Sequence, residues 1–193
     1  MRKIVITIAI LFIIVISVGL YFMLFKRVEV KTPEDLIINV KRTFTLKSSA
    51  FKYGEMIPQK YTLEGENISP PLQWRDAPAN TLSFVLIMYD PDAPRGIFYH
   101  WIMYNIPSTV TSLPEGIPNK SETPYGIQGI NSYGHVGYGG PYPPLGSKHR
   151  YIFLLLALDI KLTLKPKATV NEVLKACIGH VVAYAKLMGY YAR

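Results

Sequence analysis

The chain has 193 residues, of which 49% are hydrophobic, and its formal net charge is +8. This length suits one domain with an appendage better than two domains, and the single cysteine, Cys177, excludes an internal disulfide. Residues 1–31 hold five basic residues against one acidic residue, so half of the charge lies beside an N-terminal apolar run. The remainder is spread without a basic cluster, which disfavours nucleic-acid binding.

Residues 4–25 form an apolar run of 22 residues without a charge. A helix of ~20 such residues, rising ~1.5 Å each, crosses a bilayer. A cleaved signal peptide would have a shorter apolar region and a small-residue cleavage site, whereas the run continues through Gly19-Leu20-Tyr21-Phe22. The sequence therefore predicts an uncleaved transmembrane anchor behind a short tail, residues 1–3. Because so short a tail stays inside easily, we expect an extracytoplasmic domain.

Residues 26–40 mix charged and apolar side chains and are expected to form a spacer, with the folded domain spanning residues 41–193. Within the domain, several short apolar or alternating runs are typical of strands. Those that are apolar almost throughout suit strands covered on both faces. The predicted strands are Thr43–Phe51, Leu82–Tyr89, Phe98–Ile106 and Tyr151–Leu158.

The segment 126–146 contains seven glycines and three prolines in 21 residues. A loop of this length is usually either disordered or functional, and its tyrosines favour an ordered, functional one. Thr169 and Glu172 then form a capping box that opens a helix. We expect one helix that continues along apolar positions at helical spacing, namely Val170, Val173, Leu174, Cys177, Val181, Tyr184 and Met188. Many strands and one C-terminal helix predict a mainly β domain of packed sheets.

Asp90 and Asp92 follow a buried strand in the segment Asp-Pro-Asp-Ala-Pro, which is equally a good turn sequence. His100 lies near the start of the next strand, where a lone histidine is more often a hydrogen-bonded core residue. Neither feature alone defines a site.

A third segment, residues 139–151, combines a stiff glycine- and proline-rich loop with a strand start. His149 and Tyr151 share one strand face, whereas Arg150 points to the other. Together with Asp90 and His100, these side chains would suit an anionic ligand. A nearby carboxylate favours protonated imidazoles, which donate charge-assisted hydrogen bonds to phosphate or carboxylate oxygens.

The motifs DPDAP at 90–94, HW at 100–101, GP at 140–141 and HRY at 149–151 resemble the signature elements of the phosphatidylethanolamine-binding protein family. That family includes the Raf kinase inhibitor proteins. The stretch YTLEGENISPPLQW at 61–74 is similar to its prokaryotic branch. The resemblance covers about residues 43–193, with the order and spacing of the motifs preserved.

This resemblance implies a β-sandwich with a large central sheet, a smaller sheet and a shallow pocket for phosphate-type groups or phospholipid headgroups, without a cofactor. By motif, the ligand-binding residues are Asp90, His100, Gly140, His149 and Tyr151. The loop-shaping residues are Asp92, Pro94, Pro141 and Arg150.

Three functions are compatible with these residues. The first is a binding or regulatory module that modulates a partner such as a kinase or protease. The sequence contains no G-x-S-x-G nucleophile motif, which agrees with a binding function. The second is a metal-dependent hydrolase that uses Asp90, His100 and His149. The third is a protease inhibitor acting through loop 114–124 or loop 126–146. Cys177 is expected to be a buried small hydrophobe rather than a nucleophile, and we expect no enzyme activity.

Overall fold

The computed structural model describes residues 30–41 and 44–193. The predicted anchor, residues 4–25, lies outside the described residues. Within the described ranges, no helix is both long and apolar enough to cross a membrane.

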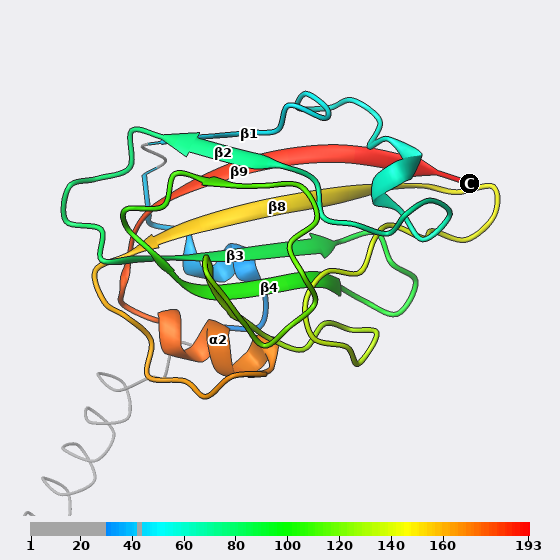
Figure 1. The fold of residues 1–193 in the computed structure, drawn as a ribbon. Helices are drawn as coiled ribbons and strands as arrows, with labels where there is room; N and C mark the ends of the chain where they lie inside the picture. The colour runs from blue at the N-terminus through cyan, green and yellow to red at the C-terminus, as the bar shows by residue number, and fades with distance from the viewer. Residues whose placement is uncertain (1–29, 42–43) are drawn as a thin grey trace, which may run out of the picture.

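Two antiparallel sheets form the domain (Figure 1). The smaller sheet has the order β1-β2-β5 and the larger the order β6-β7-β4-β3-β8-β9. The strands of the smaller sheet are β1 (Thr45–Lys47), β2 (Leu72–Arg75) and β5 (Ser112–Leu113). Those of the larger sheet are β3 (Ser83–Asp90), β4 (Phe98–Pro107), β6 (Glu122–Thr123), β7 (Gly126–Gln128), β8 (Lys148–Leu158) and β9 (Val181–Ala192). This confirms the predicted mainly β fold with a large and a small sheet.

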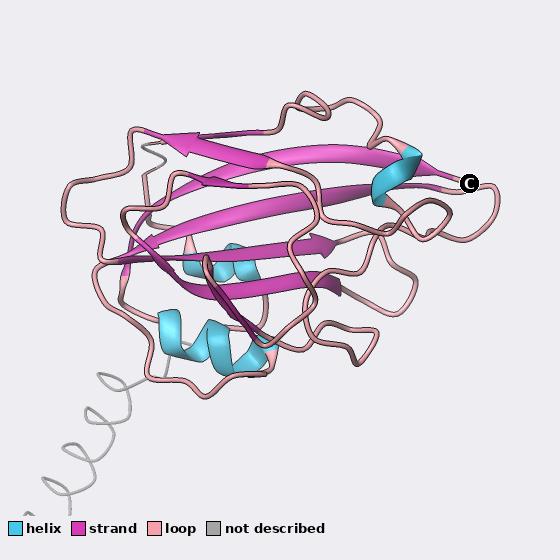
Figure 2. Ribbon diagram, viewed as in Figure 1, coloured by secondary structure: helices cyan, strands magenta, loops and turns pink. Residues whose placement is uncertain are grey.

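The larger sheet has a hydrophobic core on each face, as the continuous apolar runs predict. All eight residues of β3 are buried, and the six from Phe84 to Tyr89 alternate between the two cores. Phe84 and Met88 pack toward the smaller sheet, whereas Val85 and Ile87 pack toward the helix α2 (Val170–Cys177). Figure 2 shows the helix beneath the larger sheet, on the side away from β1 and β2.

The C-terminal helix is real but shorter than predicted. The Thr169–Glu172 capping box forms, with the Thr169 N–H donating to Glu172 Oε2 at 2.7 Å. The helix ends at Cys177, and Gly179, with a φ of +79°, turns the chain into β9. The prediction that Val181, Tyr184 and Met188 belong to the helix is wrong. A spacing of four residues fits one face of a strand as well as one face of a helix, so Tyr184 and Met188 satisfied both periods.

The expected spacer is packed onto the domain over the part that the structure describes. A short 3₁₀ helix, η1 (Pro33–Leu36), lies there, and Leu36 and Ile37 are buried in the core on the helix side. The Glu34 carboxylate accepts hydrogen bonds from the Tyr89 hydroxyl and from Lys186 Nζ, the latter at 2.5 Å. The folded unit therefore begins before residue 41.

The segment 126–146 is ordered by side chains that replace regular pairing. A second 3₁₀ helix, η2 (Gln59–Tyr61), lies behind it, and the Tyr138 hydroxyl donates to the Tyr61 carbonyl at 2.6 Å. Buried Asn131 accepts from the backbone N–H groups of Tyr133 and His135, and its amide donates to the Gly137 carbonyl. The N–H groups of Ser132 and Gly139 donate to the carbonyls of Tyr99 and His100, which holds the loop beside the start of β4.

Candidate ligand-binding site

A cavity of about 290 Å³ opens where β3 ends and β4 and β8 begin. It lies on the face of the larger sheet that carries the smaller sheet, since Met88 and Tyr151 belong to the core between the sheets. The residues that line it are Asp90, Ala93, Pro94, Phe98, His100, Tyr133, Tyr142, Pro143, Pro144, His149, Tyr151 and Arg193.

Asp90 and His149 form a buried pair in this cavity. His149 Nδ1 lies 2.7 Å from Asp90 Oδ2, and the other carboxylate oxygen accepts from the Asp92 N–H at 2.8 Å. Burial raises the pKa of Asp90, and the hydrogen bond from His149 opposes this effect. Because Nδ1 of His149 is engaged, Nε2 is the ring nitrogen left for a ligand.

A β-bulge positions His100. Met88 pairs with Trp101 and Tyr89 pairs with Tyr99, so His100 is the extra residue between two ladder positions. Bulges of this kind re-aim side chains and are common beside functional sites. The His100 ring packs against Tyr151, with a centroid distance of 5.2 Å.

The protonation of His100 follows from its partner. His100 Nδ1 lies 2.7 Å from the Gly139 carbonyl oxygen, which can only accept, so Nδ1 carries the proton. Burial lowers the pKa of His100 to about 4, so the ring is neutral near pH 7 and its Nε2 is an acceptor. This corrects the expectation that both imidazoles act as cationic donors.

Tyr151 carries an unpaired polar group into the cavity. Its side chain is fully buried, and none of the described residues accepts a hydrogen bond from its hydroxyl. Burial and the neighbouring Asp90 raise the pKa of Tyr151, so the hydroxyl keeps its proton and can donate. Buried hydroxyls are rarely left unpaired in proteins, which marks this one as a group that a ligand or a water would satisfy.

Asp92 and Arg150 fix the turn that holds Asp90. The Arg150 backbone N–H and Nε each donate to Asp92 Oδ2 at 2.9 Å, and a terminal guanidinium nitrogen lies 2.5 Å from Oδ1. Arg150 lowers the pKa of Asp92, so this carboxylate stays ionised. Both residues lie outside the cavity lining, as expected for loop-shaping residues, whereas Pro94 lines the cavity.

Gly140 supports the site from behind instead of lining it. Its N–H donates to Asn67 Oδ1 at 2.7 Å, and is therefore not free for a ligand. A Cβ at this position would lie 2.5 Å from the Tyr61 carbonyl oxygen, so only glycine fits against η2. The expectation that Gly140 contacts a ligand through its backbone is corrected accordingly. Pro141 is buried, and its carbonyl accepts from the Leu63 N–H at 3.1 Å, which anchors the same loop.

Arg193, a cation at the rim of the cavity, was not predicted from the sequence. Arg193 stacks on the Tyr142 ring, with its guanidinium carbon 3.6 Å from the ring centroid. Its Nε donates to Glu64 Oε1 at 2.9 Å, and it also donates to the Pro143 carbonyl. The sequence around Arg193 contains no motif that indicates a binding residue. Arg193 reaches the cavity because β9 pairs with β8, with Tyr191 opposite His149.

Other cavity residues were also missed as ligand candidates. Phe98 and Tyr133 pack edge to face with centroids 4.7 Å apart, and the Tyr133 hydroxyl donates to the Gly140 carbonyl. The glycine- and proline-rich composition of segment 126–146 was the signal that pointed to Tyr133, Tyr142 and their neighbours.

Two observations bear on catalysis. Across residues 30–41 and 44–193, no group of three or more His, Cys, Asp or Glu side chains is arranged to hold a metal ion. Burial raises the pKa of the Cys177 thiol to about 12, so it is not an activated nucleophile.

The fold defines a small β-sandwich domain, with a cavity lined by polar and aromatic side chains at the end of β3. Residues 47–192 match the family model described as phosphatidylethanolamine-binding protein. The chain therefore belongs to the phosphatidylethanolamine-binding protein family.

Two relatives of similar sequence are named UPF0098 protein. One from Methanothermobacter thermautotrophicus is 48% identical over 149 residues, covering 77% of this chain and 98% of the relative. Another, from Pyrococcus horikoshii, is 49% identical over 150 residues, covering 76% of this chain and 75% of the relative.

Solved structures share the fold. A phosphatidylethanolamine-binding protein homologue from Chlamydia trachomatis is 41% identical, with a TM-score of 0.72, and the match covers 79% of this chain and 99% of the other. YbcL of E. coli, described as a member of the mammalian family, is 33% identical with a TM-score of 0.72, covering 78% and 99%.

Proposed function

We propose that this chain is a membrane-tethered binding protein whose pocket takes a small oxyanion of the phosphate type, either free or as part of a phospholipid headgroup. The observation that carries the proposal is the buried, unpaired Tyr151 hydroxyl in the cavity. The ligand-binding residues are then Asp90, His100, His149 and Tyr151.

The hydrogen-bond donors of the cavity support an anion. Arg193 lines the cavity while paired with Glu64, and Asp90 orients His149 so that its Nε2 is left for the ligand. Hydrogen bonds from charged donors to phosphate oxygens are stronger than neutral ones. The cavity volume, near the lower end of ligand pockets, suits a headgroup-sized ligand.

The proposal involves binding without a catalysed reaction. The sulfur of Cys177 is buried away from the cavity and holds its proton. Family membership favours a regulatory output on a protein partner, such as a protease or a kinase, with the pocket as the ligand-sensitive element.

We expect Tyr151→Phe to separate binding from stability. Removing an unpaired buried hydroxyl leaves the free energy of unfolding unchanged or slightly higher. Loss of its hydrogen bond to an anion, ~1.5 kcal/mol, weakens phosphate binding roughly tenfold. Isothermal titration with inorganic phosphate and urea unfolding measure the two effects.

His135→Ala is the matched control, because His135 lies in segment 126–146 but outside the cavity lining. Its phosphate affinity should stay within about twofold of the wild type. Equal affinity of Tyr151→Phe and the wild type, or a clear loss of stability in Tyr151→Phe, would contradict the proposed role of the hydroxyl.

The tether rests on the apolar run of residues 4–25. We expect the full chain to sediment with membranes, to resist a high-salt wash and to be released by detergent. A chain lacking residues 1–27 should be soluble and folded, because it keeps the contacts of Glu34, Leu36 and Ile37 with the sheet. Recovery of the full chain in the soluble fraction without detergent would overturn the tether.

A further inference from the structure

A groove lies between the edge strands of the two sheets, where β1 ends the smaller sheet and β9 ends the larger one. Its volume is about 610 Å³, against about 290 Å³ for the cavity at Asp90, and the two share no lining residue. Figure 1 shows β1 and β9 along the same side of the sandwich. The residues that line the groove are Thr45, Leu46, Lys47, Ser48, Phe51, Lys52, Tyr53, Lys186 and Leu187.

The outer edge of β9 is paired over only part of its length. Residues 54–57 run along its C-terminal part. There the Tyr190 N–H donates to the Glu55 carbonyl at 2.9 Å, and the Tyr190 carbonyl accepts from the Ile57 N–H at 2.7 Å. The backbone groups of an antiparallel strand turn to alternate sides with a period of two, so Lys186 also turns its N–H and C=O away from β8. No described residue pairs with these two groups.

Strand β1 presents unpaired backbone groups on the opposite wall of the groove. The Trp74 N–H of β2 donates to the Thr111 carbonyl at 2.8 Å, on the side of β5. Leu46 lies opposite Trp74 in the antiparallel register, so it turns its own N–H and C=O away from β2 and toward the groove. These groups also lack a partner within the part of the chain that the structure describes. Unpaired strand edges of this kind are templates for an added strand.

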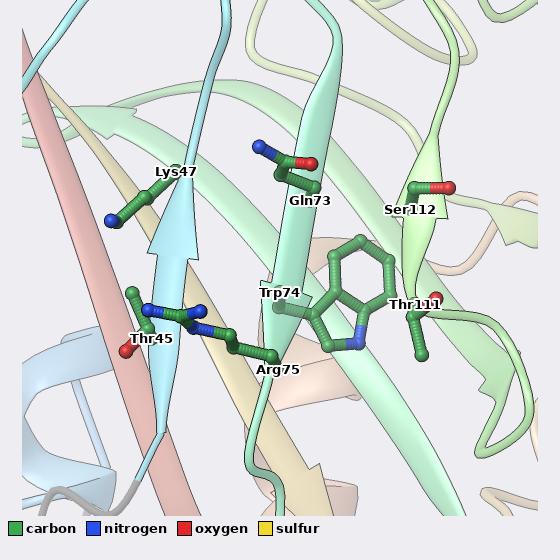
Figure 3. Close-up of a pocket in the computed structure, with 7 residues that line it drawn as sticks. All are labelled: Thr45, Lys47, Gln73, Trp74, Arg75, Thr111 and Ser112. Carbon is green, nitrogen blue, oxygen red and sulfur yellow. The ribbon is translucent and has the colours of Figure 1, made fainter.

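The groove is also cationic, since Lys47, Lys52 and Lys186 line it and no acidic residue does. Lys186 Nζ is held by the Glu34 carboxylate at 2.5 Å, whereas the ammonium groups of Lys47 and Lys52 have no partner within residues 30–41 and 44–193. In Figure 3 the Lys47 side chain leaves β1 on the side away from β2. A segment that enters the groove therefore meets two unpaired positive charges.

Apolar side chains form the remainder of the lining. Phe51 and Leu187 belong to the core between the sheets and reach the groove where the sheets open. Tyr53 also lines the groove and is 67% exposed. Tyrosine is enriched in protein interfaces, where its ring packs against apolar side chains of the partner.

Charge selects between the two kinds of strand that such an edge accepts. A second copy of this chain would bring the same lysines, and the chain carries a net charge of +8, so pairing between two copies is opposed. An acidic strand meets no such repulsion and neutralises the two unpaired ammonium groups.

We propose that the groove binds an extended, acidic segment of a partner protein, which adds as a strand beside β9. Its backbone pairs with Lys186 and continues the pairing that residues 54–57 begin. Its acidic side chains contact Lys47 and Lys52, and an apolar side chain packs on Tyr53. Segments that add to a sheet edge gain affinity from main-chain hydrogen bonds and specificity from side-chain contacts. This surface is separate from the pocket at Asp90.

The probe is a hexapeptide in which glutamate and valine alternate, blocked at both ends. Its addition to the full chain in non-ionic detergent should shift the Lys186 amide signal in a ¹H–¹⁵N spectrum in a saturable manner. Hydrogen exchange of the same amide should slow, because the N–H gains a partner. A lysine–valine hexapeptide should have neither effect. The glutamate–valine peptide methylated at every backbone nitrogen keeps its charges but cannot donate to a strand, and should bind at least tenfold more weakly.

Charge variants test the part played by the two unpaired lysines. Lys47→Gln and Lys52→Gln should each weaken binding of the glutamate–valine peptide about threefold, and the double variant about tenfold. Lys175→Gln, an exposed change of equal charge on α2, should leave the affinity unchanged. Tyr151→Phe should also leave it unchanged, which separates this surface from the pocket at Asp90.

Four results would overturn the proposal. They are a Lys186 amide that neither shifts nor exchanges more slowly at millimolar glutamate–valine peptide, equal binding of the lysine–valine peptide, equal binding of the methylated peptide, and undiminished binding in the double variant. The Trp101 indole N–H donates to Gln128 Oε1 at 2.7 Å in the interior, so an unmoved Trp101 signal in each variant shows that the fold is intact.

Discussion

Acidification from pH 7 to pH 4 is expected to cost the domain about 3 kcal/mol of unfolding free energy through His100 alone. In the folded state, burial lowers the pKa of His100 to about 4, from the ordinary value of 6.5. Between these two values the unfolded chain binds the proton and the folded chain does not. The free energy of unfolding is therefore not reduced by His100 above about pH 6.5, and it decreases as the pH falls toward 4.

Asp90 acts in the opposite sense. Its pKa is raised in the folded state, so the folded chain takes up this proton first as the pH falls. That uptake favours folding in the range just above 3.8, the ordinary value, and partly offsets the loss from His100. The effect of His100 must therefore be measured against a variant that keeps Asp90.

His100→Asn is the suitable variant, because the asparagine Nδ2 can replace the Nδ1–H that donates to the Gly139 carbonyl. Urea unfolding of both proteins from pH 7 to pH 4 should show the wild type losing about 3 kcal/mol more than the variant. Parallel curves for the two proteins would show that His100 is not held neutral.

Strands β3, β4 and β8 could be predicted because their long apolar runs indicate burial on both faces. The run around Ile87 is apolar at every position, and the structure alternates these residues between two cores. The C-terminal helix was overextended for a local reason. The sequence of α2 and the sequence of β9 share apolar spacings of four, and only residues 178–180, with Gly179 at a positive φ, separate them.

Those site residues could be predicted whose orientation follows from their residue type and their position along a strand. Placing His149 and Tyr151 on one face and Arg150 on the other needs only the period of a strand, and the burial of the three residues agrees. Arg193 and Asn67 could not be found in this way. They reach the site through the pairing of β8 with β9 and through a loop contact, both of which connect residues far apart in the sequence.

The role of His100 also required the structure. From the sequence, a histidine at the start of an aromatic strand is expected to be a core residue. In the structure, the bulge opposite Met88 and Tyr89 directs the His100 side chain toward the cavity. Its hydrogen bond to the Gly139 carbonyl then fixes the tautomer, which sequence alone cannot supply.

The pocket at Asp90 is expected to prefer phosphate over sulfate by roughly tenfold or more near pH 7. Neutral His100 offers the lone pair of Nε2, which must accept a hydrogen bond. Phosphate carries at least one proton at this pH and can donate it, whereas sulfate carries none. A sulfate oxygen would face the lone pair and leave a buried acceptor unpaired, at a cost of ~1–3 kcal/mol.

Two comparisons make this preference diagnostic. Glycerol phosphate, a monoester that has lost most of its second proton near pH 7, should bind more weakly than inorganic phosphate. Dimethyl phosphate, a diester without a proton, should bind like sulfate, so the pocket is expected to take free phosphate in preference to the phosphate diester of a phospholipid headgroup. Near pH 4 about half of the His100 rings carry a proton on Nε2 and can donate it, so the preference for phosphate over sulfate should shrink. Calorimetric titration of the four anions at both pH values measures these differences. Sulfate binding as tight as phosphate binding at pH 7 would show that Nε2 of His100 does not face the ligand as an acceptor.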